Sequence, residues 1–249
     1  MKKLKIFLSR DEISYEAGVK IKETSLIETE ILYIEDFVQE KLWNTITDDD
    51  IIHFSCNSDL IKNVLEKIKD KKCYIYNKEY LLKNHNKKEI QLKLEEIGIR
   101  IPEIYSNIDN VKFPVFIKEN KHTGIILEAY TPSTLKYLLE KMENKNYYLE
   151  ESIHKNVRKE IKVYVVNKKV YFKDGEKINK EIKRVSENIA NYFNDIEIYS
   201  ADFIVTDKGY YFIDFNAAVG FYKTKKGRKA FVDSAYKIAY ENKSLRNRT

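Results

Sequence analysis

The sequence predicts an α/β protein that opens with a small parallel sheet and continues into mixed α+β structure. Two observations carry this prediction. Strand-like runs alternate with helical patterns over the first 76 residues, and short strands, hairpin turns and amphipathic helices follow from residue 77. Alternating strands and helices are typical of a parallel sheet with right-handed crossovers. We divide the chain into segments 1–76, 77–149 and 150–249.

The first segment alternates strands and helices. Strands are expected at 5–9, 30–34, 51–55 and 73–76, and helices at 15–22, 37–46 and 60–69. The last of these helices has apolar residues at helical spacing after capping residues at 57–59. The segment lacks G-x-G-x-x-G and G-x-x-x-x-G-K-[ST], which argues against a Rossmann dinucleotide site and a P-loop. We interpret it as a substrate-side module.

The later segments begin with a helix at Lys87–Ile97 that ends before Gly98, as a C-cap glycine requires. The expected strands are "KFPVFIKE", "GIILEAYTP", "NYYLEESI" and the hairpin "EIKVYVVNKKVYF", which turns at Asn167-Lys168. The expected helices are "TPSTLKYLLEKME", capped by Thr131, Ser133 or Thr134, then "EIKRVSENIANYF" and "KAFVDSAYKIAYENK".

Composition narrows the class of protein. Of the 249 residues, 43% are hydrophobic and 34% charged, with a net charge of +6, which suits a globular chain. No apolar run approaches a membrane span, and the first apolar run is too short for a signal peptide. The basic cluster at 222–231 is expected to be a solvated loop, so we predict no nucleic-acid partner. Two cysteines suit a reducing compartment, and we expect the protein in the cytoplasm.

The stretch "ADFIVTDKGYYFIDFN" predicts a hairpin with acids inside its apolar strands. A three-residue Asp-Lys-Gly loop would place Asp202 opposite Asp214, and Asn216 projects from the same face as Asp214. Two interpretations remain open. Either the register slips or the face is solvated and the acids are ordinary, or a divalent cation lies between them. Mg²⁺ favours carboxylate and amide oxygens and shares them with nucleotide phosphates.

Cys56 and His53 are near one another in sequence but lie at i, i+3 of a strand, so their side chains face opposite sides. We expect both to be core residues. The chain shows no convincing nucleophile with a partnered base.

Together with a helix-start lysine, a strand-end lysine and a strand ending in paired acids, the hairpin resembles the ATP-grasp superfamily of carboxylate–amine ligases, in particular the ATP-binding domain of glutathione synthetase. The resemblance covers about residues 77–222. It implies a small N-terminal parallel α/β domain followed by two α+β subdomains that clasp ATP.

The resemblance assigns roles to four residues in three motifs. "NHNKKEIQLKLEEIGIRIP" implies Lys87 as the first phosphate-binding lysine, with Asn86 in place of the usual aspartate. "FPVFIK" implies Lys118 as the second nucleotide lysine. "KEIKVYVV" implies Glu160 at a ribose hydroxyl and Lys162 on the phosphate side.

Two further motifs complete the implied site. "YYLEESI" implies that Glu150 and Glu151 lie beside the base, where backbone groups of Glu151 and Ile153 read its amino edge. The acid hairpin implies Mg²⁺, with Mn²⁺ as an alternative, on three residues: Asp202, Asp214 and Asn216.

The chain departs from the family pattern in further places. Its lid, "ENKHTG", is short and has one glycine, so Lys121 and His122 either supply the missing donors, with His122 in a catalytic role, or are solvated turn residues. Ser200 and Ala201 stand where many relatives carry a substrate-binding arginine.

The resemblance implies an ADP-forming ligase for a small carboxylate and an amine, either an amino acid or a peptide. Two alternatives stay open: a kinase-like phosphotransferase of the same fold, and a non-catalytic nucleotide-binding module. A homodimer is also left open.

Overall fold

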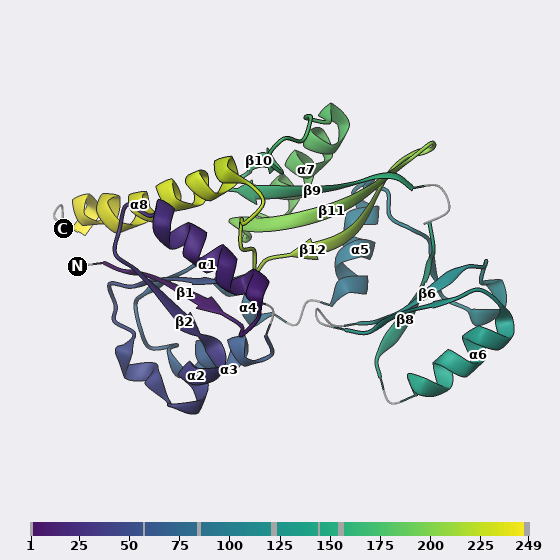
Figure 1. The fold of residues 1–249 in the computed structure, drawn as a ribbon, viewed down its shortest axis with the longest axis horizontal. Coiled ribbons are helices and arrows are strands. Elements are labelled where there is room, and N and C mark those ends of the chain that lie inside the picture. Colours follow the sequence, from purple (N-terminus) through teal and green to yellow (C-terminus); the bar gives the residue numbers. More distant parts are fainter. Residues whose placement is uncertain are drawn as a thin grey trace. The chain divides into compact units, whose positions relative to one another are not determined.

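The computed structural model describes residues 2–56, 58–83, 86–120, 124–143, 145–153 and 157–246. Figure 1 shows the elements in chain order: β1 (Leu4–Leu8), α1 (Glu12–Thr24), β2 (Thr29–Tyr33), α2 (Ile34–Gln39), η1 (Leu42–Thr45), β3 (Ile51–Phe54), α3 (Leu60–Lys67), β4 (Tyr74–Ile75), α4 (Lys78–Leu82), α5 (Lys87–Glu96), β5 (Ile104–Tyr105), η2 (Ile108–Asn110), β6 (Val115–Glu119), β7 (Ile126–Ala129), α6 (Pro132–Lys141), β8 (Tyr147–Glu151), β9 (Val157–Val166), β10 (Lys169–Phe172), α7 (Lys180–Tyr192), β11 (Ile198–Thr206), β12 (Gly209–Asn216) and α8 (Lys225–Arg246).

The contacts divide the chain into two compact units. The first comprises Met1–Asn84, Val163–Ser200 and Asn216–Thr249, and the second comprises His85–Lys162 and Ala201–Phe215. The units therefore interleave along the chain, whereas the three expected segments are consecutive. The three-segment division stays a prediction.

The first sheet confirms the parallel module expected at the N-terminus. Its order is β2-β1-β3-β4, and every adjacent pair is parallel. All of β1 is buried, as expected for a central strand covered on both faces. His53 is buried among the rings of Tyr76, Phe221 and Phe231, whereas Cys56 packs in a separate cluster with Phe37. Both are core residues.

One expectation for the first segment is wrong, and one short helix directly after it was not expected. The helix expected at 37–46 is a short α2, Ile34–Gln39, followed by the 3₁₀ turn η1, Leu42–Thr45. Between them Lys41 has a φ of 55°, which no α-helix can contain. Helix α4, Lys78–Leu82, was not expected, since five residues are too short to show a periodicity.

The second sheet has the order β5-β8-β6-β7, and its β5–β8, β6–β8 and β6–β7 pairs are antiparallel. One face forms an apolar core in which Ile117 and Leu149 pack with Leu135 of α6. Alternation along the strands turns Lys118 and Glu150 to the opposite face. The sheet therefore has one apolar and one polar buried side.

The third sheet has the order β10-β9-β11-β12. Its first hairpin turns at Asn167 and Lys168, both at positive φ (47° and 66°), as the sequence predicted and as a type I′ turn requires. In the second, β11 ends at Thr206 and β12 begins at Gly209, whose φ is 110°. The turn lies where expected, but two residues, Asp207 and Lys208, separate the strands instead of the expected three-residue loop. The residue-by-residue register of Asp202 against Asp214 stays a prediction.

Within the described ranges, no helix is both long and apolar enough to span a lipid bilayer.

Candidate functional site

Helix α5 positions the first candidate residue, Lys87, in its opening turn. The Asn86 side chain accepts a hydrogen bond from the Glu89 N–H at 2.7 Å, so the residue that replaces the expected aspartate still caps the helix. The helix ends before Gly98, whose φ of 80° suits the C-cap predicted there. The Lys88 N–H also donates to the Asn120 side chain at 3.2 Å, which ties the start of α5 to the end of β6.

Lys87 pairs with the second hairpin acid. Its Nζ lies 3.3 Å from Oδ1 of Asp214, with side-chain exposures of 18% and 34%. Both side chains are partly exposed, so they stay accessible to a ligand. The candidate phosphate lysine thus contacts a candidate metal ligand.

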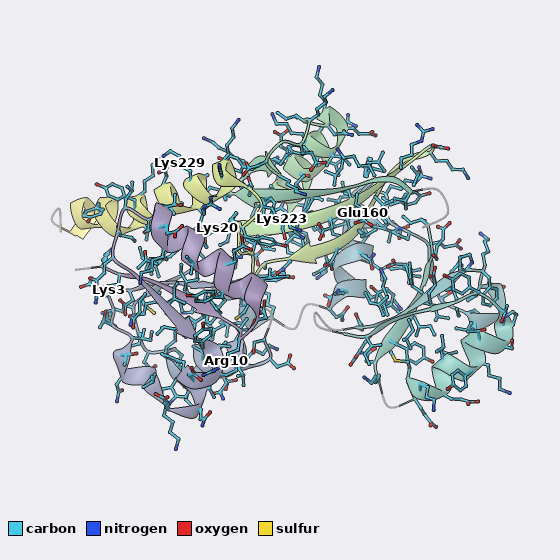
Figure 2. All side chains as sticks on the ribbon, viewed as in Figure 1. Lys3, Arg10, Lys20, Glu160, Lys223 and Lys229 are labelled. Carbon is cyan, nitrogen blue, oxygen red and sulfur yellow. The ribbon has the colours of Figure 1, made fainter. Side chains whose placement is uncertain are left out.

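Lys162 pairs with the first hairpin acid in the same way. Its Nζ lies 2.6 Å from Oδ2 of Asp202. Burial raises the pKa of Asp202 and Lys162 opposes this rise, while the charges of Asp214 and Glu160 raise the pKa further. Glu160 itself is exposed on β9 (Figure 2). The hairpin therefore carries negative charge that a cation would stabilise.

Lys118 forms the third lysine–acid pair, and this pair is buried. Its Nζ contacts Oε1 of Glu150, with side-chain exposures of 11% and 2%. The second oxygen of Glu150 accepts from the Gln91 amide at 2.8 Å. The ammonium also lies 5.6 Å from the ring centroid of Phe116. The strand-end lysine is thus held deep in the second unit.

The donor set of the hairpin fits a hard divalent cation. Asp202 and Asp214 supply carboxylate oxygens, and Asn216 supplies an amide oxygen two residues along β12. That amide oxygen accepts from the Ala218 N–H at 2.8 Å, which orients it. Among the described residues no three His, Cys, Asp or Glu side chains gather as a metal cluster. Any cation here needs further ligands, such as phosphate oxygens or water.

Comparison with known proteins gives a fold. No family model matches the chain, and no curated protein matches it. Solved structures do match. N5-carboxyaminoimidazole ribonucleotide synthetase from Thermotoga maritima is 16% identical, over 87% of this chain and 68% of that chain, with a TM-score of 0.59. N5-carboxyaminoimidazole synthase from Aspergillus clavatus, in complex with ADP and 5-aminoimidazole ribonucleotide, is 11% identical. The match covers 86% of this chain and 69% of that chain, with a TM-score of 0.62.

The ATP-grasp ligase PsnB, complexed with a minimal precursor, Mg and ADP, covers nearly the whole chain. It is 13% identical over 95% of this chain and 98% of that chain, with a TM-score of 0.63. This chain has the ATP-grasp fold. The fold expected from the lysine and acid motifs is therefore confirmed, although identities this low carry the fold alone.

The strand expected to face the base in an ATP-grasp protein is β8 and the residues after it. The Glu151 N–H donates to the Glu103 carbonyl at 2.8 Å, and the Glu151 carboxylate accepts from the Glu103 N–H at 3.3 Å. Ile153 is buried. Contacts of Glu151 and Ile153 with a base stay a prediction.

The lid candidates Lys121 and His122 lie outside the described residues. The backbone on either side is tied together. The Glu119 N–H donates to the Ile125 carbonyl at 2.8 Å, and the Glu119 carboxylate accepts from the Ile125 N–H at 3.1 Å. These two bonds extend the pairing of β6 and β7 to Glu119 and Ile125.

Sequence reasoning missed Gln91 and Tyr148. Gln91 as a whole residue is 2% exposed, and its side-chain oxygen accepts a hydrogen bond from the Tyr148 hydroxyl at 3.0 Å. A signal was present in the helical periodicity. Gln91 lies one turn after Lys87 on α5, beside Ile90 and Leu94 of the buried face, where an apolar residue would be expected.

Proposed function

We propose that this chain is an ATP-dependent ligase that joins a carboxylate to an amine through an acyl phosphate and releases ADP and phosphate. The observation that carries the proposal is the set of three lysine–acid pairs in the second unit: Lys87–Asp214, Lys118–Glu150 and Lys162–Asp202. All six residues are those that the motifs assign to ATP or to its metal, and the fold supports the assignment.

The chemistry asks little of the protein beyond positioning and positive charge, because phosphoryl transfer needs no protein nucleophile. Lys87 and Lys162 would bind phosphate oxygens, and Lys118 would bind the nucleotide from the polar face of the second sheet. Asp202, Asp214 and Asn216 would hold Mg²⁺, or Mn²⁺, which polarises the transferred phosphoryl group. Glu150, Glu151, Ile153 and Glu160 would hold the base and ribose, and His122 would serve the lid.

The solved structures support the cofactor assignment. The Aspergillus enzyme was crystallised with ADP, and PsnB with Mg and ADP. Each of these groups suits the donors that this chain gathers. The substrates proposed here are a small carboxylate and an amine, as a free amino acid or a peptide.

One observation favours a second candidate, a kinase-like phosphotransferase. Ser200 and Ala201 are fully buried where many relatives carry an arginine for the substrate carboxylate. Without that arginine, the site lacks the group that holds the substrate carboxylate in many relatives. A phosphotransferase, which transfers the phosphoryl group and joins no amine, does not depend on that group.

The deciding experiment measures ADP release with Mg²⁺ and ATP over a panel of amino acids, peptides and polyamines, offered singly and in pairs. A ligase releases ADP only when an acid and an amine are both present. Release with a single compound supports the phosphotransferase. No release, together with no thermal stabilisation by Mg²⁺ and ATP, contradicts both and favours a non-catalytic module. Asp214→Asn is the matched control for background hydrolysis.

A further inference from the structure

A buried chain of side chains leads to Lys118. The Tyr148 hydroxyl donates to Gln91 Oε1 at 3.0 Å, Gln91 Nε2 donates to Glu150 Oε2 at 2.8 Å, and Glu150 Oε1 contacts the Lys118 ammonium. As residues, Glu150 is 1% exposed, Gln91 2%, Tyr148 4% and Lys118 8%. We name these four residues the Lys118 relay.

The register of the second sheet fixes how the relay is assembled. Lys118 of β6 lies opposite Tyr148 of β8, and Glu150 lies opposite Phe116. Lys118, Tyr148 and Glu150 therefore share one face, with Glu150 diagonal to Lys118. Gln91 reaches this face from α5 and bridges the two β8 side chains. The relay thus joins one helix and two strands of the second unit.

Hydrogen-bond polarity gives the relay a single direction. A carboxylate only accepts, so Gln91 must turn its NH₂ toward Glu150 and its oxygen toward Tyr148. Burial raises the pKa of Tyr148, and the negative charges of Glu150 and Asp214 raise it further, so its hydroxyl stays a donor. Every group upstream of Glu150 therefore donates toward the carboxylate.

Stability is a weak reason for a chain to keep such an arrangement. Burying two charges removes their hydration, and apolar residues of similar volume often serve a core as well or better. An ammonium has three donors, and among the described residues Lys118 donates to the Glu150 carboxylate alone. A buried, oriented ammonium with further donors suits an anionic or electron-rich ligand.

We infer that Gln91 and Tyr148 are positioning residues for nucleotide binding. They hold the Glu150 carboxylate in one orientation, and Glu150 in turn aims the Lys118 ammonium at the nucleotide. The inference rests on the proposed function, because it takes Lys118 as a nucleotide contact. It assigns a role to two residues that lie within the family motifs but were given no role by them.

The test is a double-mutant cycle on affinity for a non-hydrolysable ATP analogue with Mg²⁺, measured by calorimetry. Gln91→Met keeps the volume but removes both hydrogen bonds, and should weaken binding about 10-fold. Tyr148→Phe removes only the outer donor and should weaken binding about 3-fold. In the Lys118→Met background, Gln91→Met should cause no further loss, since the group it positions is absent.

Controls separate positioning from structural damage. Tyr105→Phe removes a tyrosine hydroxyl from β5 of the same sheet, outside the relay, and should leave affinity unchanged. Thermal unfolding of each variant establishes that it is folded. If Gln91→Met fails to fold, Tyr148→Phe and its cycle with Lys118→Met decide the question.

The outcomes are distinguishable from failure of the proposed function. Loss in Gln91→Met or Tyr148→Phe that vanishes in the Lys118→Met background supports the inference. Loss in Lys118→Met with wild-type affinity in Gln91→Met and Tyr148→Phe overturns it and leaves the proposed function standing. Losses that simply add also overturn it. Unchanged affinity in Lys118→Met would mean that Lys118 does not contact the nucleotide, and the inference would then be wrong as well.

Discussion

Each unit contains a buried lysine, and the two differ in how their ammonium groups are used. Lys5 of the first unit is 4% exposed and meets the Thr45 carbonyl at 2.8 Å, Glu30 at 3.1 Å and Asp50 at 3.8 Å. Lys118 of the second unit, within the described residues, meets the Glu150 carboxylate alone. An ammonium has three donors; Lys5 meets one carbonyl and two carboxylates of its own chain, whereas Lys118, among the described residues, contacts one carboxylate. Several acceptors around an ammonium mark a structural lysine, and fewer mark a candidate binding lysine.

The largest effect should come from Asp214 in the candidate metal-binding hairpin. Asp214→Asn removes the charge that pairs with Lys87 and would hold the cation, so ADP release should fall at least about 100-fold, since a metal contributes several kcal/mol. Circular dichroism and thermal unfolding should show an intact fold. Near wild-type release would contradict the metal assignment.

The comparison of lysines predicts a large loss of stability in the first unit. Lys5→Met leaves Asp50, which is 3% exposed, without its charge partner, and should cost about 3–5 kcal/mol of unfolding free energy. Nucleotide affinity of the folded protein should not change. Denaturant unfolding and calorimetry on Lys5→Met and Lys118→Met measure both quantities. A loss of affinity in Lys5→Met would break the distinction between the two lysines.

His53 predicts that the first unit is sensitive to acid. Burial lowers the pKa of His53 from 6.5 to about 4, because the Val219 carbonyl at 2.8 Å only partly opposes the desolvation. The unfolded chain binds the proton first, so stability is full above pH 6.5 and is lost as the pH falls toward 4. The loss should be about 3 kcal/mol. Denaturant melts across this range test it, and His53→Gln should flatten the profile.

The smallest effect is expected at the cap of α5. Asn86→Ala removes the acceptor for the Glu89 N–H and should cost about 1 kcal/mol of stability. Because Lys87 is the next residue, affinity for the ATP analogue should fall slightly as well. Asn86→Asp restores the acceptor and should recover both. A stability loss with no change in affinity would show that the cap does not position Lys87.

Local sequence signals predicted the elements that depend on local chemistry. The stop at Gly98 was readable, and Thr131 was among the three cap candidates named for its helix, because a positive φ or a capping side chain acts within a few residues. The cap at Asn86 was not predicted. The break at Lys41 was not readable, since a lysine carries no preference for positive φ.

The pairing of charges could not be predicted from sequence. Lys87 and Asp214, or Gln91 and Glu150, are far apart along the chain, and only the packed fold decides which acid meets which lysine. The motifs marked the lysines and acids as members of a site. They did not show which acid each lysine meets.

Asn77 sets a limit on how this protein can be dissected. Its side chain donates to the carbonyls of Ile198 at 2.6 Å and Ala217 at 2.9 Å and accepts from the N–H of Glu197 at 2.8 Å. Asn77, a single residue that follows the N-terminal sheet, therefore clamps the chain at the start of β11 and just after β12. A fragment cut after Tyr76 would lose this clamp, and the excised first segment would expose the surface that the later chain covers. Limited proteolysis should accordingly yield nicked but associated pieces, and a truncated gene encoding residues 78–249 alone should give insoluble protein.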